Sequence, residues 1–360
     1  MLFLEAIFGY IGAVKASENN FDFLRFLLAS FVIITHSYAL LGTPENDLLM
    51  QISGGQVRFS TLAVRGFFVI SGYLIFLSLE RSSSVWNFLK KRVLRIMPGL
   101  VAMTFVVILF SAFFLTKESV TAFLFSRETF VYAAKNILMF FGINPPLHDV
   151  FVSNPVPAIT NGSLWTLSYE ALFYLILAGF FFVKRSWRMP VFVGLWISLY
   201  VARLWWTPSL VLFPYTSFEA YHLIDFGLYF LAGAILSHFV ERMKSNFGII
   251  FCGALLVMIL AGAVHLYGAL QYIALPVAVI SLAWISLPPL NRWGNFGDFS
   301  YGIYIYAFFV QQVLVYFFPS MSLGLFMTLS FVGSWACGIL SWYLVERWTI
   351  RSRSQLQKSV

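Results

Sequence analysis

Residues 21–37 read FDFLRFLLASFVIITHS. This stretch is long and apolar enough to cross a lipid bilayer as an α-helix, yet it carries Asp22 and Arg25 near its start and His36 near its end. The step from Arg25 to His36 covers about 16 Å and about three turns of an α-helix, so both side chains lie on one face at different depths. Ionisable groups are costly in hydrocarbon and usually mark functional positions, so this segment predicts a membrane protein with a polar interior.

The composition extends this conclusion to the whole chain. Of 360 residues, 60% are apolar and 11% are charged, which leaves too little polar surface for a soluble domain and predicts a polytopic membrane protein. The net charge of +8 comes largely from Lys and Arg in short connecting segments, where it sets membrane orientation, and no basic patch with interspersed aromatic residues indicates nucleic acid binding. Cys252 and Cys337 lie in apolar runs, so we expect neither a disulfide framework nor a metal site.

Ten stretches approach the length of about 20 residues that a membrane-spanning helix needs. They are approximately residues 21–41, 60–79, 98–116, 163–183, 189–206, 220–240, 248–266, 270–288, 299–318 and 324–345. The sequence therefore predicts an all-α bundle of about ten transmembrane helices. We expect one membrane domain over residues 1–360, with an uncleaved interfacial helix at residues 1–16 and no fused extracytoplasmic domain.

Basic residues predict which side of the membrane each connection faces. Lys or Arg follows the second, fourth, sixth, eighth and tenth stretches, whereas the connections after the fifth, seventh and ninth carry neither. Because cytoplasmic loops are enriched in these residues, both termini are expected in the cytoplasm, including a tail at residues 346–360. The longest connection, residues 117–162, then lies outside, and its Asn-Pro-Pro and Asn-Pro-Val-Pro sequences predict an irregular loop.

Three ionisable side chains are expected at one depth near the outer surface. His36 lies in the outer third of the first span, Glu170 in the outer third of the fourth, and Arg65 near the outer end of the second. An imidazole, a carboxylate and a guanidinium at one depth can neutralise one another, which lowers the cost of burying them. The spacing is equally compatible with a structural polar cluster that only holds helices together.

A second polar group is expected at the cytoplasmic end. Arg25 lies just inside the first span, and Arg92 and Arg95 lie one turn apart before the third, next to Lys90 and Lys91. The positive-inside bias alone can account for the two lysines, but it accounts less well for Arg25, which lies deeper than orientation requires.

Five short motifs resemble, in their order along the chain, those of the acyltransferase family 3 membrane proteins. This family includes bacterial O-antigen and peptidoglycan O-acetylases and rhizobial Nod-factor acyl-modifying enzymes. The motifs are the Arg25 to His36 pair, FFVISGYL at 67–74, RVLRIMP at 92–98, SLWTLSYE at 163–170 and FSYGIY at 299–304. The resemblance covers nearly the whole chain. It departs from the family pattern at Tyr306-Ala307, where many relatives have a His, and in lacking the C-terminal esterase-like domain of some relatives.

The resemblance implies an enzyme of the bacterial inner membrane that moves an acyl group, usually acetyl, from cytoplasmic acyl-CoA to a hydroxyl of an extracytoplasmic glycan. O-antigen, exopolysaccharide or a lipid-linked sugar would be the acceptor, and acetyl-CoA would be a substrate instead of a permanently bound cofactor. Arg25, Arg92 and Arg95 would bind the phosphates of coenzyme A. His36 would act as general base, with Glu170 orienting its imidazole. An acyl-His intermediate is the open alternative to direct attack.

Four further residues are candidates for contacting the substrate or the developing oxyanion. Arg65 or Tyr169 could donate hydrogen bonds to the oxyanion, and Trp165 could do the same or stack on a sugar ring. Ser71 could act as a nucleophile, but it has no obvious paired base. The Ser71-Gly72 step is more typical of a close approach between helices.

The remaining histidines are expected to have no catalytic role. His222 and Asp225 lie one turn apart at the outer end of the sixth span, a spacing that could serve metal or acceptor binding but favours an interfacial pair. His148, His238 and His265 lie in loops or at span ends and are expected to be solvated.

Two other functional classes are compatible with ten spans and buried polar residues. A transporter or flippase of lipid-linked sugars would be favoured by inverted halves with broken helices, and the sequence shows no such symmetry. A non-catalytic membrane partner in surface polysaccharide assembly is the other class. Labelling of glycan from acetyl-CoA would separate an enzyme from both. The expected partners are acyl-CoA, a glycan acceptor and membrane lipid, and the sequence predicts no oligomeric state.

Overall fold

The computed structural model describes residues 19–139, 145–205 and 218–349, and these residues form helices and connecting segments with no β-strand among them. The predicted all-α class is therefore confirmed. The predicted interfacial helix at residues 1–16 and most of the predicted tail at 346–360 lie outside the described residues.

Eight helical segments are long and apolar enough to cross a membrane, which confirms a polytopic bundle. They are α2 (Phe21–Leu40), α4 (Phe59–Glu80), α5 (Val85–Phe114), α8 with its flanking turns (Gly162–Phe182), α11 to α12 (Val240–Ala263), α13 (Tyr267–Trp284), α15 (Ser300–Phe317) and α16 with its extension (Leu323–Thr349). The other two predicted spans also form helices, α9 (Arg185–Trp205) and α10 (Ala220–Leu236). Of these, α10 is apolar but only 17 residues long.

The shorter elements complete the described chain. They are α3 (Leu48–Ile52), α6 (Val120–Leu124), α7 (Arg127–Leu138), η2 (Gly162–Leu164), α8 proper (Trp165–Gly179), η3 (Phe180–Phe182), α11 (Val240–Met243), η4 (Lys244–Asn246), α12 (Phe247–Ala263), α14 (Pro288–Asn291), η5 (Trp293–Asn295), α16 proper (Leu323–Ser341) and the π-helical turn η6 (Trp342–Glu346).

Two expectations about the third span and its loop were wrong. The span was expected to begin at Pro98, but α5 begins at Val85 because the Ser84 side chain caps its first turn, and Pro98 lies inside the helix. The following connection was expected to be irregular throughout, but serine caps start α6 and α7 within it. The basic residues before Pro98 therefore sit on a rigid helix.

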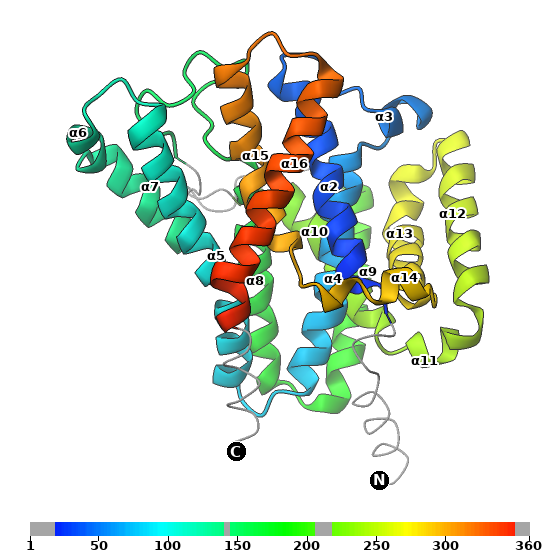
Figure 1. Ribbon diagram of the computed structural model, residues 1–360. Helices are drawn as coiled ribbons and strands as arrows, with labels where there is room; N and C mark the ends of the chain where they lie inside the picture. Colours follow the sequence, from blue (N-terminus) through cyan, green and yellow to red (C-terminus); the bar gives the residue numbers. More distant parts are fainter. Residues whose placement is uncertain (1–18, 140–144, 206–217, 350–360) are drawn as a thin grey trace.

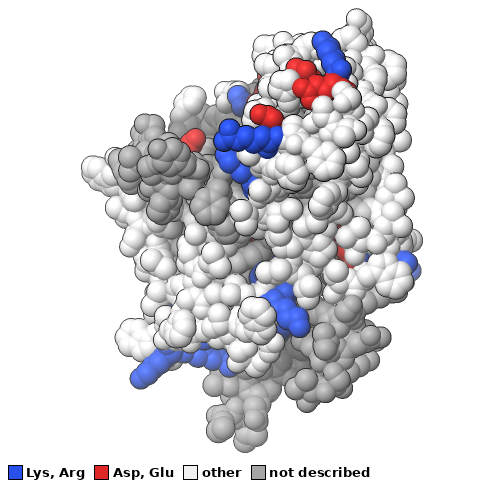
Figure 2. Space-filling view, turned by 90° about the vertical axis from the view of Figure 1, so that its left-hand side faces the viewer, with Lys and Arg blue, Asp and Glu red and all other residues white. Residues whose placement is uncertain are grey.

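Figure 1 shows how the spans are arranged. The first, α2, begins in the lower half of the view and runs upward, and the extension of α16 ends in the lower half. The hairpin of α12 and α13 forms one flank, and α6 and α7 lie at the upper left. On the face seen in Figure 2, charged side chains gather toward the two ends and leave a belt between them that is mostly free of charge, as a membrane-embedded surface requires.

The centre of the bundle is the pair α4 and α10, which pack more extensively than any other two described helices. Two glycines allow this contact. A Cβ atom added at Gly72 would lie 1.8 Å from the backbone oxygen of Phe230, and one added at Gly233 would lie 2.1 Å from the backbone oxygen of Val69. Small residues let membrane helices approach until their backbones touch, and the predicted role of Gly72 is of this kind.

The outer loop is held against α15 by buried amide side chains. Asn154 donates to the backbone oxygen and the side-chain oxygen of Gln312, at 3.0 and 2.6 Å. Gln312 in turn donates to the backbone oxygens of Val156 and Ile159. Asn161 donates to the backbone oxygen of Ile305 at 2.5 Å. These bonds satisfy polar groups that would otherwise be buried unpaired, and they fix the chain just before α8.

Replacing Gly72 by Ala is expected to lower the thermal stability of the protein in detergent, because α4 and α10 must separate to accommodate the new Cβ atom. Overpacking of this kind costs about 1–3 kcal/mol. The measurement is the midpoint of thermal unfolding followed by size-exclusion chromatography. The matched control is Gly253→Ala on α12, where no heavy atom lies within 4 Å of the added Cβ. A Gly72→Ala protein as stable as the control would contradict the backbone contact.

Candidate active site

Two cavities lie between the same helices. The first, which we call the arginine cavity, has a volume of about 120 Å³ and is lined by Arg25, Arg92, Arg95, Ser71 and Glu170 among others. The second, the histidine cavity, has a volume of about 250 Å³ and is lined by His36, Arg65, Trp165, His222 and Asp225 among others. Helices α2, α4, α8 and α15 contribute to both, whereas α5 lines only the first and α10 only the second.

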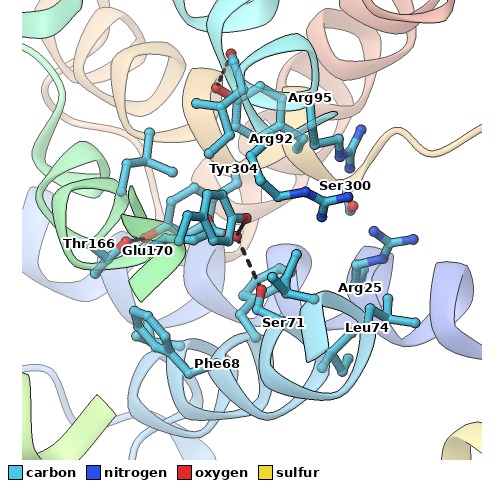
Figure 3. Close-up of a pocket in the computed structure, with 18 residues that line it drawn as sticks. Arg25, Phe68, Ser71, Leu74, Arg92, Arg95, Thr166, Glu170, Ser300 and Tyr304 are labelled. Atoms are coloured by element: carbon cyan, nitrogen blue, oxygen red, sulfur yellow. Dashed lines mark hydrogen bonds between the residues drawn. The ribbon is translucent and has the colours of Figure 1, made fainter. Parts of the chain in front are cut away.

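The three predicted arginines meet in the arginine cavity, and Asp298 holds two of them. Figure 3 shows the guanidinium groups of Arg25, Arg92 and Arg95 at the same end of the cavity. Asp298 Oδ2 lies 3.1 Å from Arg25 Nη1 and 2.5 Å from Arg95 Nη2. Burial alone would raise the pKa of Asp298, but these two cations and Ser300 hold it at about 2, so the carboxylate is charged at neutral pH.

The charges of Arg25 and Arg95 are thus largely compensated by protein carboxylates. Arg25 also pairs with Asp22, and Arg95 Nη1 lies 3.6 Å from a carboxylate oxygen of Glu346. Sequence reasoning missed Asp298 and Glu346. The available signal was their position, because Asp298 directly precedes the FSYGIY motif and Glu346 lies in the basic C-terminal segment.

Arg92 differs from the other two arginines. Its Nη2 atom donates to the Ser78 hydroxyl at 3.3 Å, and its guanidinium lies 5.8 Å from the ring centroid of Tyr174. Among the described residues no carboxylate forms an ion pair with Arg92, although Glu170 in the same cavity attracts it over a longer distance. Because Arg25 and Arg95 are each paired with Asp298 and Arg92 is not, Arg92 is the position in this cavity best suited to an anionic ligand.

Glu170 also faces the arginine cavity. Its Oε1 atom accepts hydrogen bonds from the hydroxyl of Ser71, at 3.1 Å, and from the hydroxyl of Tyr174 (Figure 3). The sequence suggested no base for the candidate Ser71, but the structure pairs its hydroxyl with the Glu170 carboxylate.

His36 projects into the histidine cavity from the upper part of α2. Its ring meets the edge of Phe308, with centroids 5.3 Å apart, and its buried Nδ1 has no hydrogen-bond partner among the described residues. The neighbouring Thr35 hydroxyl donates to Asp47 at 2.6 Å and accepts from the backbone N–H of Ser60 at 2.9 Å. These bonds tie the end of α2 to the start of α4 and fix the position of the imidazole.

Arg65 pairs with Asp225, which the sequence analysis had assigned to His222. Its Nε and Nη2 atoms donate to the two carboxylate oxygens of Asp225, at 3.1 and 3.3 Å, and Nη1 donates to Gln271 at 2.7 Å. The expected interfacial pair of His222 with Asp225 was therefore wrong. His222 Nε2 lies 3.5 Å from Glu219, and its ring packs on Trp165 at a centroid distance of 4.6 Å.

His36 and Glu170 do not touch, although their predicted depths were the same. No hydrogen bond joins them within the described chain, and each lines a different cavity. The assignment of Glu170 as the group that orients the imidazole therefore lacks the necessary contact.

Of the two aromatic residues predicted to contact the substrate, Trp165 and Tyr169, only one lines a cavity. Trp165 lines the histidine cavity. Tyr169 is fully buried behind it, with ring centroids 5.7 Å apart, and its hydroxyl accepts the backbone N–H of Glu219 at 2.8 Å. Tyr169 lines neither of these two cavities, and its ring packs against Trp165.

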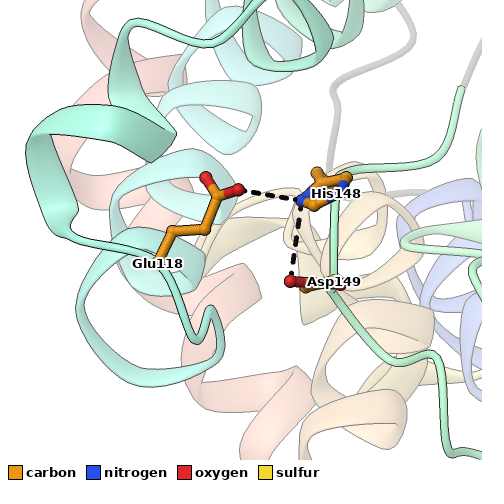
Figure 4. Close-up of side chains that lie close together, drawn as sticks. All are labelled: Glu118, His148 and Asp149. Atoms are coloured by element: carbon orange, nitrogen blue, oxygen red, sulfur yellow. Dashed lines mark ion pairs between the residues drawn. The ribbon is translucent and has the colours of Figure 1, made fainter.

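A third group of ionisable residues lies in the outer loops. His148 Nδ1 lies 3.2 Å from Glu118 and 3.6 Å from Asp149 (Figure 4). His148 was predicted to be solvated, and its side chain is 52% exposed. It is also paired with the two carboxylates. His238 and His265 are exposed, as predicted.

Comparisons with known proteins agree with the motifs. A family model described as an acyltransferase domain matches residues 18–345. The chain is 34% identical to the O-acetyl transferase of Shigella phage Sf6, over 94% of this chain and 98% of that protein. It is 29% identical to the exopolysaccharide production protein ExoZ of Rhizobium meliloti (strain 1021), over 83% and 92% of the two chains.

A third relative is nodulation protein 10 of Rhizobium leguminosarum bv. viciae, which is 28% identical over 94% of this chain and 95% of that protein. No solved structure matches the chain. With the family model covering nearly all of the described helices and a relative matched over almost its full length, the chain belongs to the acyltransferase family 3 of membrane proteins.

Proposed function

We propose that this protein is an O-acetyltransferase of the bacterial inner membrane that moves an acetyl group from cytoplasmic acetyl-CoA to a hydroxyl of an extracytoplasmic glycan. The observation that carries the proposal is the pair of adjoining cavities, one lined by three arginines and one by a histidine whose buried Nδ1 has no hydrogen-bond partner among the described residues. The names of the relatives support a polysaccharide acceptor, because they include an O-acetyl transferase and an exopolysaccharide production protein.

The donor site is assigned to the arginine cavity. Coenzyme A carries phosphates, and Arg92 offers a guanidinium that forms no ion pair with a carboxylate among the described residues. The cavity of about 120 Å³ suits the narrow pantetheine arm, with the diphosphate at the end where the guanidinium groups lie. The adenosine would lie toward a neighbouring cavity of about 240 Å³, which Arg25 also lines together with Arg81 and Trp284. Arg25 would then contact the donor between the two cavities, and Arg95 would hold Asp298 in place.

The acceptor site is assigned to the histidine cavity. Trp165 presents an aromatic ring to this cavity, and aromatic rings stack on the apolar faces of sugars. Tyr221 and the hydroxyls of Ser60 and Thr61 supply neutral hydrogen-bonding groups in the same wall. This lining of aromatic and hydroxyl groups suits a glycan hydroxyl.

The proposed reaction uses His36 as general base. The neutral imidazole takes the proton of the sugar hydroxyl while that oxygen attacks the thioester carbon. The new C–O bond forms, the C–S bond breaks, and the proton passes from the imidazolium to the departing thiolate, which leaves as coenzyme A thiol. Arg65, held by Asp225, keeps a positive charge in the wall of the cavity, where it stabilises the negative charge that develops on the thioester oxygen.

In this proposal Glu170 helps to form the donor site, because it lines the arginine cavity. By accepting from Ser71 and Tyr174, its carboxylate fixes two hydroxyls in the wall of the arginine cavity. The three residues would shape the path of the pantetheine arm, and neither Glu170 nor Ser71 would react with the substrate.

Replacing His36 by Gln is expected to reduce acetyl transfer by about 10²- to 10⁴-fold, the contribution of a positioned general base. The measurement is incorporation of radiolabelled acetyl from acetyl-CoA into glycan in isolated membranes, with the amount of inserted protein determined by immunoblot. His238→Gln is the matched control, because His238 is exposed and lines neither cavity. Transfer at the control rate by His36→Gln would contradict the catalytic role.

Replacing Arg92 by Gln is expected to raise the KM for acetyl-CoA by about 10- to 100-fold, because a charge-assisted bond to phosphate is lost. The thermal stability should change little, since no carboxylate is left unpaired. Arg95→Gln provides the contrast, because it removes a partner of Asp298 and should lower stability as well. Arg242→Gln is the control, since Arg242 lines neither cavity. An unchanged KM in Arg92→Gln would exclude Arg92 from donor binding.

A further inference from the structure

The arginine cavity and the histidine cavity share two lining residues, Val64 on α4 and Tyr304 on α15. Tyr304 is the larger of the two and is only 8% exposed. These two side chains therefore face both cavities, and Tyr304 is the bulkier part of this shared wall.

Tyr304 is held in this position from two sides. Its hydroxyl shares a hydrogen bond of 2.6 Å with the Thr166 hydroxyl on α8. Its ring meets the edge of Phe67 on α4, with centroids 5.7 Å apart. Figure 3 shows the bond from Tyr304 to Thr166 at the side of the arginine cavity that lies away from the three guanidinium groups. The contacts thus join α15 to α8 and α4 at one point.

The proposed reaction requires that the donor thioester be separated from water before the acceptor binds and that it reach His36 afterwards. A thioester can react with water as well as with a sugar hydroxyl. In hydrolysis, the oxygen of water bonds to the carbonyl carbon, the C–S bond breaks, and acetate and coenzyme A thiol are released. A donor that waits in the arginine cavity must be kept from water in the histidine cavity, yet it must reach His36 when the acceptor is bound.

We propose that Tyr304 is a movable partition between the donor and acceptor cavities, and that it prevents hydrolysis of the donor thioester until a glycan is bound. This inference rests on the proposed function. Opening needs the loss of one hydrogen bond to Thr166 and a rotation of one side chain, without movement of a helix.

The test compares two activities of the purified protein in lipid vesicles. One is transfer of radiolabelled acetyl to glycan, and the other is release of coenzyme A thiol in the absence of glycan. Tyr304→Ala removes the partition and should raise acceptor-independent thiol release at least 10-fold relative to wild type, while transfer falls. Tyr306→Ala is the matched control, since Tyr306 lies on the same helix, is similarly buried and lines neither cavity.

Two milder variants keep the test decisive if Tyr304→Ala does not fold. Tyr304→Phe and Thr166→Val each remove the hydrogen bond and retain a bulky wall, so each should raise the ratio of hydrolysis to transfer about 2- to 10-fold, the population change expected for one neutral hydrogen bond. A ratio equal to wild type in all folded variants would overturn the partition. Absence of transfer by the wild-type protein would instead overturn the proposed function, so the two failures are distinguishable.

Discussion

A charge inside a lipid bilayer is stable only when an opposite charge or a set of hydrogen bonds accompanies it, and this constraint organises the interior of the protein. Arg65 is matched by Asp225 and Gln271, and Arg25 and Arg95 are matched by Asp298. These pairs connect helices far apart in the sequence and hold the walls of the two cavities. Arg92 and His36 differ from these residues because neither has an ion pair with a carboxylate among the described residues, and the buried Nε of Arg92 and Nδ1 of His36 have no hydrogen-bond partner there. Polar groups that the protein itself leaves unsatisfied are the natural contacts for substrates.

The close contact of α4 and α10 makes the two-cavity arrangement possible. With Gly72 and Gly233 at the crossing, the two backbones touch, and the side chains of α4 project to either side of this contact. Arg65 then faces the histidine cavity and Ser71 faces the arginine cavity, less than two turns further along the helix. The same division occurs on α2, which presents Arg25 to one cavity and His36 to the other. Arg25 and His36 thus lie on one helix at different depths and face different cavities.

Much of this organisation could be predicted from the sequence. Hydropathy and the clustering of basic residues predicted the helical class, and the depth of Arg25, Arg92 and Arg95 placed all three in one cavity. The rotation of each helix and the partners of each side chain could not be predicted. Glu170 was assigned to His36 because both were placed in the outer third of a span, but the carboxylate lines the other cavity and bonds to Ser71 and Tyr174. Asp225 was assigned to its sequence neighbour His222, whereas its partner Arg65 is 160 residues away. The motif residue Tyr304 gave no sign of its place between the cavities, since its neighbours there come from two other helices, α8 and α4.

The central claim is that donor and acceptor reach one reaction centre from opposite sides of the membrane. It is tested most directly with sealed vesicles of known orientation that contain the protein and a glycan acceptor, supplied from outside with radiolabelled acetyl-CoA. In the orientation that the basic connections predict, inverted vesicles expose the end of the bundle at which α2 begins, and they should label glycan in their lumen. Right-side-out vesicles should label none unless they are made permeable to the donor. Equal labelling by intact vesicles of both orientations would contradict a donor cavity that opens only toward the cytoplasm.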